Sequence, residues 1–135
     1  MTESVLIDSS VWIALLRGGV PDLRERLATR AADGGRIVMC EPVAMELLAG
    51  AKPSAMADIE RLVDGLPSLI LDPILDFRVA ADLSRRARTA GRTVRSSMDC
   101  LIAAVATRHD ALLVHHDRDF DVLAAVSPLR AERWD

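Results

Sequence analysis

Short apolar runs alternate along the chain with longer stretches of helical periodicity, and this alternation limits the fold more than any other feature. The strand-like runs are, by residue number, 5–7, 37–39, 69–71 and 111–114, with one further edge strand expected around Leu129. Strands that alternate with helices form mostly parallel sheets whose two faces are covered. We therefore predict an α/β fold with a mostly parallel central sheet of four to five strands and helices on both faces.

Glycines and proline-containing turns separate the stretches that have helical periodicity. The predicted helices span residues 9–17, 21–32, 42–50, 54–65, 75–90, 97–108 and 118–125. Gly18-Gly19 and Gly91 are stop signals, and Pro21 opens the second of these helices. Five residues of the stretch 75–90 are available for an apolar face: Phe77, Ala80, Ala81, Leu83 and Ala87.

The length of 135 residues and an apolar content of 50% suit one compact domain over residues 1–135. No uncharged apolar run approaches the roughly 18 residues of a membrane-spanning helix, and the N-terminus lacks a signal-peptide pattern. Cys40 and Cys100 lie in apolar stretches, which favours buried, reduced thiols over a disulfide. We expect a soluble cytoplasmic protein.

The formal net charge of -3 argues against nucleic-acid binding through bulk charge. Lys52 is the only lysine, and the other sixteen cationic residues are arginines. Arginine suits phosphate recognition, but this bias can equally reflect a GC-rich genome. With no Tyr, two Phe and two Trp, the chain has no aromatic platform on which many bases could stack.

Two carboxylates follow strands of the predicted sheet. Asp8 comes directly after 5–7, between apolar segments, and Asp117 follows 111–114 after two histidines. In open α/β sheets ligands bind at the carboxyl ends of the strands, so both side chains reach one crevice if their strands are adjacent. A buried carboxylate is usually paired, metal-bound or neutralised. Each residue also has a structural interpretation, as the N-cap of the following helix.

Asp99 and Glu46 lie within predicted helices. Asp99 could form a variant capping box with Ser96, and Glu46 could be a solvated helix residue. If the four acids are collected at one site, however, their like charges repel, by about 4 kcal/mol for two charges about 4 Å apart at an effective dielectric near 20. A divalent cation removes this repulsion, and oxygen ligands favour Mg²⁺ or Mn²⁺. The residues therefore indicate a metal-dependent nuclease or phosphoryl-transfer site.

Four stretches carry a resemblance to a known family: LIDSSVWIALL, EPVAMELLAG, MDCLIAAVA and LLVHHDRDF. In order and approximate spacing they resemble the PIN-domain ribonucleases, most closely the VapC-type toxins of toxin-antitoxin pairs. The resemblance implies that Asp8 and Asp99 are direct metal ligands and that Glu46 is the second acidic member of the catalytic set. Asp117 would complete this set through a water molecule. The implied cofactor is Mg²⁺ or Mn²⁺.

Residues around these four acids carry lesser expectations. Ser9 and Ser10 stand where members of the family usually carry a pair of small hydroxyl residues, and Ser10 could hydrogen-bond an acidic side chain. Asp119 is expected to support the site as a helix-start residue that adds negative field, and Asp121 to be solvated. His115 stands where many relatives carry Thr, which raises the alternative that His115 approaches the substrate.

The resemblance also implies partners that composition does not indicate. They are an RNA substrate, either tRNA or rRNA, a VapB-like antitoxin and a second copy of the chain. No contact with a membrane is expected. An arginine-rich run is the candidate contact with the RNA backbone, and its alternative is a solvated helix face and loop. Its members are Arg85, Arg86, Arg88, Arg92 and Arg95.

Other functions fit the sequence less well. A haloacid-dehalogenase-like phosphatase would need a second Asp where Ser10 stands, and a receiver-like module would need a lysine after a late strand, whereas Lys52 lies between two helices. A catalytically silent PIN-like module that binds RNA or protein remains as the alternative. We expect the toxin of a type II pair, an endoribonuclease that cleaves a phosphodiester by attack of metal-activated water.

Overall fold

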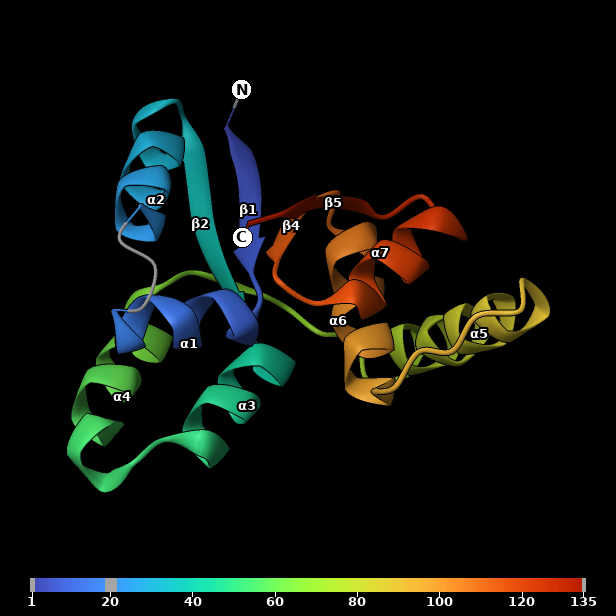
Figure 1. Cartoon of the computed structure of the whole chain (residues 1–135), viewed down its shortest axis with the longest axis horizontal. Coiled ribbons are helices and arrows are strands. Elements are labelled where there is room, and N and C mark those ends of the chain that lie inside the picture. The colour runs from blue at the N-terminus through green and yellow to red at the C-terminus, as the bar shows by residue number, and fades with distance from the viewer. Residues whose placement is uncertain (1, 19–21, 135) are drawn as a thin grey trace.

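A computed structural model describes residues 2–18 and 22–134, and its strands form a parallel sheet (Figure 1). In this described part of the chain five strands pair in the order β3-β2-β1-β4-β5. They are β1 (Glu3–Ile7), β2 (Gly35–Cys40), β3 (Ser68–Leu69), β4 (Leu112–His115) and β5 (Arg130–Arg133). Every neighbouring pair is parallel, so the predicted α/β fold is confirmed.

Helices connect the strands and flank the sheet (Figure 1). They are α1 (Ser9–Arg17), α2 (Leu23–Ala32), α3 (Glu41–Gly50), α4 (Met56–Gly65), α5 (Leu75–Thr89), α6 (Ser97–Arg108) and α7 (Arg118–Ala125). In the central strand β1, three consecutive residues have no exposed surface: Val5, Leu6 and Ile7. Because successive side chains of a strand point to opposite faces, both faces of the sheet are covered, as predicted. No described helix combines the length and apolar character that a membrane crossing requires.

Three predicted strands are displaced from their expected positions. The strand expected at 111–114 is β4, which begins and ends one residue later. The strand expected at 69–71 is β3, which ends at Leu69, because the Ile70 carbonyl accepts hydrogen bonds from side chains at the end of α6. The edge strand expected around Leu129 is β5, which begins one residue later and pairs with β4.

The predicted helices agree more closely with the structure than the strands do. The helix expected to begin at Ser54 is α4, which begins at Met56 after a 3-10 turn at Pro53–Ala55. The others start or end within two residues of the expected positions wherever the structure describes those positions. Gly19 and Pro21, which were expected at helix ends, lie outside the described residues.

The long helix α5 packs along α6 and forms, with the loop that follows it, an arm on one side of the molecule (Figure 1). Of the five residues predicted for its apolar face, Ala80, Leu83 and Ala87 are buried. Phe77 is 53% exposed, and Ala81 is exposed as well. Both line a groove of about 450 Å³ between α5 and α6, so part of this apolar face is uncovered.

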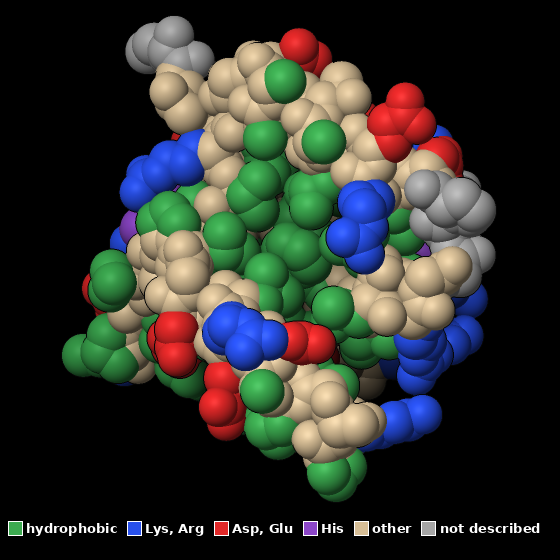
Figure 2. Space-filling model, turned by 90° about the vertical axis from the view of Figure 1, so that its left-hand side faces the viewer, with side chains coloured by type: hydrophobic (Ala, Val, Ile, Leu, Met, Phe, Trp, Pro, Cys, Tyr) green, Lys and Arg blue, Asp and Glu red, His purple; other side chains and the backbone are tan. Residues whose placement is uncertain are grey.

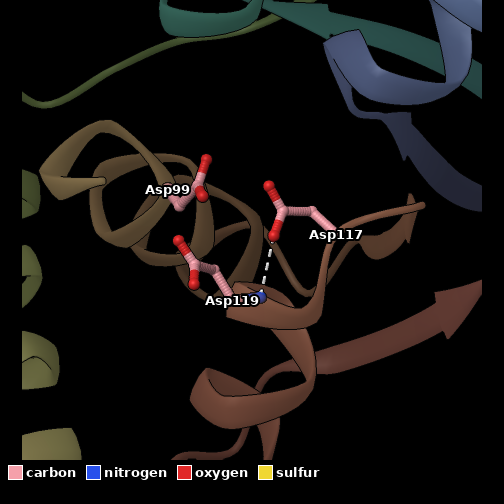
Figure 3. A group of neighbouring side chains, drawn as sticks. All are labelled: Asp99, Asp117 and Asp119. Carbon is pink, nitrogen blue, oxygen red and sulfur yellow. Dashed lines mark hydrogen bonds between the residues drawn. The ribbon is translucent and has the colours of Figure 1, made fainter. Parts of the chain in front are cut away.

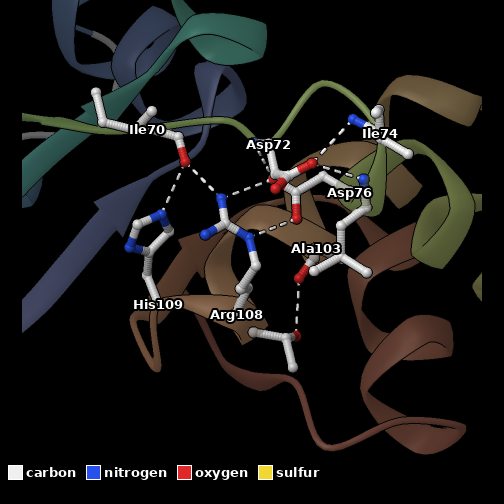
Figure 4. Close-up of polar contacts among 9 residues, drawn as sticks. Ile70, Asp72, Ile74, Asp76, Ala103, Arg108 and His109 are labelled. Atoms are coloured by element: carbon white, nitrogen blue, oxygen red, sulfur yellow. Dashed lines mark hydrogen bonds and ion pairs between the residues drawn. The ribbon is translucent and has the colours of Figure 1, made fainter.

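An ion pair joins the C-terminal end of α6 to the first turn of α5 (Figure 4). Arg108 donates from Nε and Nη2 to the two carboxylate oxygens of Asp76, at 2.8 and 2.9 Å. Asp76 has no exposed surface and also accepts from the Asp72 N–H at 2.8 Å. Burial alone would raise the pKa of Asp76, but these donors outweigh it and hold the pKa below its ordinary value. The pair fixes the passage from β3 into α5.

Candidate metal centre

Asp8 lies where β1 ends. Its backbone N–H donates to the Val114 carbonyl of β4 at 2.9 Å, and its side chain caps α1 by accepting from the Ser10 N–H at 3.1 Å. The Ser10 hydroxyl donates to the same carboxylate oxygen, Oδ2, at 2.5 Å, as expected. Asp8 is 3% exposed, and its Oδ1 is buried without a hydrogen-bond partner among the described residues. Burial raises the pKa of Asp8 in spite of the Ser10 hydrogen bonds.

Glu46 reaches the same region from α3. The Ser9 hydroxyl, in the first turn of α1, donates to Glu46 Oε1 at 3.1 Å. The carboxyl group is half-buried, not solvated, and this burial, together with the negative charges of Asp8 and Asp117, raises its pKa. The adjacent hydroxyls of Ser9 and Ser10 therefore hold one carboxylate each.

Three further carboxylates converge on one another (Figure 3). Asp99 comes from the first turn of α6, and Asp117 is the N-cap of α7, where its Oδ1 accepts from the Asp119 N–H at 2.9 Å. One oxygen of each of Asp99, Asp117 and Asp119 lies within 4.8 Å of the others. Because β1 and β4 are neighbours, Asp8 and Asp117 follow adjacent strands. We call Asp8, Glu46, Asp99, Asp117 and Asp119 the acid cluster.

Asp99 carries the strongest electrostatic perturbation of the acid cluster. Its pKa is raised to about 8, first by burial, then by the adjacent Asp119 carboxyl group and by the charges of Asp8 and Asp117. Asp99 is 6% exposed, so water screens little of this repulsion. In the absence of a cation, this crowding therefore favours a proton shared by Asp99 and its neighbouring carboxylates.

Without a cation, the free energy of unfolding should fall as the pH rises toward 8. Asp99 has an ordinary pKa of 3.8 and a folded value of about 8, so between them the folded chain holds a proton that the unfolded chain has lost. Each pH unit between these two values therefore lowers the free energy of unfolding by up to about 1.4 kcal/mol, and this slope fades as the pH passes 8. Urea unfolding in EDTA measures this slope, and Asp99→Asn should flatten it. A wild-type stability that rises across this window would contradict the prediction.

The donor set of the acid cluster fits a hard divalent cation. Every member offers carboxylate oxygens, which such cations prefer as ligands. Two buried oxygens, Asp8 Oδ1 and Asp119 Oδ1, have no partner among the described residues. Buried polar atoms are rarely left without a partner, because the lost hydration is not replaced. A cation would give both oxygens a partner and would offset the like charges around Asp99.

Two expectations about these acids need correction. Ser96 is the N-cap of α6, but its side chain makes no capping hydrogen bond, so it forms no capping box with Asp99. Asp119 does more than add negative field, since it is 2% exposed and belongs to the close group of three carboxylates. The D-x-D spacing of Asp117 and Asp119 at a helix start was the available signal, because both residues lie at the same helix end. Asp121 is exposed, as expected.

His115 is a supporting residue and not a substrate contact. It is 1% exposed, its ring packs against Phe120 with 5.3 Å between the ring centroids, and its Nδ1 accepts from the Asp117 N–H at 3.2 Å. Burial lowers the pKa of His115, so the ring is neutral at pH 7. The alternative that His115 approaches the substrate is therefore wrong, and the ring instead supports the turn that carries Asp117.

The arginine-rich run lies on the arm formed by α5 and the loop after it. All five arginines are exposed. Arg86 pairs with Asp82 at 2.9 Å. The other four side chains make no ion pair within the described part of the chain: Arg85, Arg88, Arg92 and Arg95. Exposed, unpaired guanidinium groups are suited to phosphate oxygens.

Comparison with known proteins places these features in a family. Residues 5–126 match the PIN domain. Ribonuclease VapC11 of Mycobacterium tuberculosis is 50% identical over 132 residues, which cover 94% of this chain and 96% of that protein. The solved VapBC2 complex of Rickettsia felis, bound to a promoter DNA fragment, aligns with a TM-score of 0.80 at 17% identity over 98% of this chain and 99% of that chain. VapC20 of M. tuberculosis, described as a sarcin-ricin loop cleaving toxin, aligns with a TM-score of 0.65 at 18% identity, covering 93% and 98%.

Proposed function

As the chain belongs to the PIN-domain family, we propose that it is the ribonuclease toxin of a type II toxin-antitoxin pair. The observation that carries the proposal is the acid cluster, in which carboxylates gather at the carboxyl ends of β1 and β4 with two buried oxygens left without a described partner. The half-identical relative is itself named a ribonuclease, which supports the same activity here. The substrate we propose is tRNA or rRNA, which would place its action in the cytoplasm.

The residues of the acid cluster have separate tasks in cleaving a phosphodiester. Asp8 and Asp99 would hold Mg²⁺ or Mn²⁺, which when bound supplies charge stabilisation to the phosphate and lowers the pKa of water. Ser10 keeps the Asp8 carboxylate oriented through two hydrogen bonds. Asp117 is the least buried of the close group and orients the attacking water. Glu46, whose pKa is raised, is suited to accept the proton of that water.

Purified protein should cleave RNA only when a divalent cation is present. Product should form with Mg²⁺ or Mn²⁺, disappear with EDTA and return when the cation is restored, because the carboxylates alone repel a phosphodiester. Sequencing of RNA 5′ ends after brief expression would identify the cut RNA. Cleavage that persists in EDTA would contradict the proposal. Binding of RNA without cleavage under either cation would favour the catalytically silent module.

We place the VapB-like antitoxin on an apolar surface beside the acid cluster. Figure 2 shows hydrophobic side chains gathered across the face of the molecule on which α1, α2 and α4 lie. A groove of about 320 Å³ between α1, α3 and α4 is lined by apolar side chains that include Ile13, Leu16 and Ile59. Glu46 lines the same groove, so a partner seated there could direct a basic residue to the acid cluster. The Rickettsia felis homologue was solved as a VapBC complex, which supports such a partner.

Leu16→Asp should weaken antitoxin binding by about 10- to 100-fold, since it removes part of the apolar area and buries a charge. Calorimetric titration with the product of the adjacent reading frame measures the affinity. Leu75→Asp is the matched control, because Leu75 is 47% exposed, close to the 48% of Leu16, but lies on α5. Equal affinities for both variants would place the antitoxin elsewhere.

A second copy of the chain is the partner we assign to the uncovered apolar groove between α5 and α6. Phe77 is exposed there and Leu101 lines the groove from α6. An exposed apolar groove of this kind is typical of an interaction surface. Sedimentation should give twice the 14.7 kDa mass of the chain, and a monomer mass at all concentrations would exclude the homodimer.

A further inference from the structure

Asp119 connects the acid cluster to the loop between α5 and α6. Its Oδ2 accepts from the backbone N–H of Arg95 at 3.0 Å and from that of Ser96 at 3.3 Å. Its Oδ1 is buried without a partner among the described residues, and Figure 3 shows its carboxylate beside that of Asp99. One side chain therefore contacts both the cluster and the backbone of an arginine-bearing loop.

The two ends of this loop are held by different devices. At the α5 end, Gly91 follows the C-cap residue Ala90, adopts a φ of 75° and donates its N–H to the Arg88 carbonyl at 2.9 Å, which ends the helix. At the α6 end the Ser96 side chain makes no capping hydrogen bond. The Ser96 backbone N–H donates to the Asp119 carboxylate on α7. Within the described chain, residues 93 and 94 make no backbone-backbone hydrogen bond. Val94 packs against the core, and beyond that contact the backbone of Arg95 is held by its hydrogen bond to Asp119.

The backbone of Arg95 lies beside the acid cluster, since its amide nitrogen is 3.0 Å from Asp119 Oδ2. Its side chain is exposed and makes no ion pair with the described residues. A guanidinium group presents paired N–H donors that match the oxygens of a phosphate. An RNA strand that places one phosphodiester at the acid cluster carries its next phosphate nearby. Among the five arginines of the run, Arg95 is the one whose backbone is bonded to the cluster.

We propose that Asp119 is a positioning residue, which holds Arg95 so that its guanidinium binds the phosphate next to the scissile one. This inference rests on the proposed ribonuclease function, because it describes how the RNA strand is held at that site. The carboxylate that belongs to the acid cluster would thereby set where the RNA backbone lies relative to the reacting phosphodiester.

Asp119→Asn and Asp119→Ala separate the loop contact from the charge. Both variants lose the negative charge, but only asparagine keeps an oxygen that can accept from Arg95 and Ser96. Trypsin cleaves after arginine, so digestion of the folded, RNA-free protein reports on the loop. Cleavage after Arg92 and Arg95 should be on the order of tenfold faster in the alanine variant than in the asparagine variant. Asp121→Ala, on the same helix, should behave as wild type, and equal rates in both Asp119 variants would overturn the proposal.

RNA binding in EDTA tests the phosphate contact without cleavage. For a short single-stranded RNA, Arg95→Ala should reduce the slope of log affinity against log salt by about 0.7, the value for one phosphate. The same substitution should reduce the slope equally in the Asp119→Asn background but much less in the Asp119→Ala background. A loss that is the same in all three backgrounds would show that Asp119 does not position Arg95.

Hydrogen exchange of the wild-type protein decides the matter if the alanine variant does not fold. The amides of Arg95 and Ser96 should exchange at least about tenfold more slowly than that of Thr93. Equal exchange would overturn the proposal. Failure of the proposed function has a different signature: a protein with these loop results that cleaves no RNA under either cation refutes the ribonuclease activity while supporting the Asp119 contact.

Discussion

Asp99→Asn should lower the rate of RNA cleavage by about a thousandfold or more while leaving the protein folded. A divalent cation contributes several kcal/mol to a phosphodiester transition state, and about 1.4 kcal/mol corresponds to a factor of ten in rate. Asparagine keeps the shape of the side chain but removes a charge from a group of three carboxylates that lie within 4.8 Å of one another. Initial cleavage rates of a defined RNA at saturating Mg²⁺ measure the effect.

The stability of the same variant separates a chemical effect from a folding effect. The pKa of Asp99 is about 8 in the folded chain, so at pH 8 without a cation Asp99→Asn should unfold at the wild-type temperature or above it. Asp121→Asn, an exposed acid on α7, should keep the wild-type cleavage rate. A folded Asp99→Asn protein that retains more than about a tenth of the wild-type rate would remove Asp99 from the catalytic set.

Arg108→Leu should lower the free energy of unfolding by about 3 kcal/mol. The substitution leaves the Asp76 carboxylate buried with only one remaining donor, the Asp72 N–H. Breaking a buried ion pair in this way destabilises a protein by about 3–5 kcal/mol. The Arg108 side chain is 31% exposed and that of Asp76 1%, which points to the lower end of this range. Urea unfolding at pH 7 measures the loss.

Two controls isolate the buried carboxylate as the cause. The double variant Asp76→Leu, Arg108→Leu removes the unpaired charge and should recover part of the loss, whereas Arg86→Leu breaks an exposed pair and should change stability by less than about 1 kcal/mol. Because the fold lowers the pKa of Asp76 from 3.8, its contribution is complete above that value and disappears as the pH falls through the folded value. A double variant less stable than Arg108→Leu would contradict this account.

Local patterns and one topological rule were enough to predict the sheet and the position of Asp8 and Asp117. Asp8 directly follows an apolar strand and Asp117 follows another after two histidines, and parallel strands bring their carboxyl ends to one edge. The hydrogen bonds from the loop to Asp119 could not be predicted, because they depend on how α6 packs against α7 across 23 or 24 residues of sequence. The Arg108–Asp76 pair likewise joins residues 32 positions apart, and local periodicity does not encode such distances.

The pairing of β1 with β4 also has a consequence for synthesis of the chain on the ribosome. The Ser10 hydroxyl, which orients Asp8, accepts from the His116 N–H, 106 residues later in the sequence. A growing chain therefore exposes Asp8 long before α6 and α7 exist, and β1 must wait for its neighbour β4. The five carboxylates of the acid cluster cannot assemble before translation has passed Asp119. A ribonuclease site of the kind we propose is therefore incomplete until α7 has been translated.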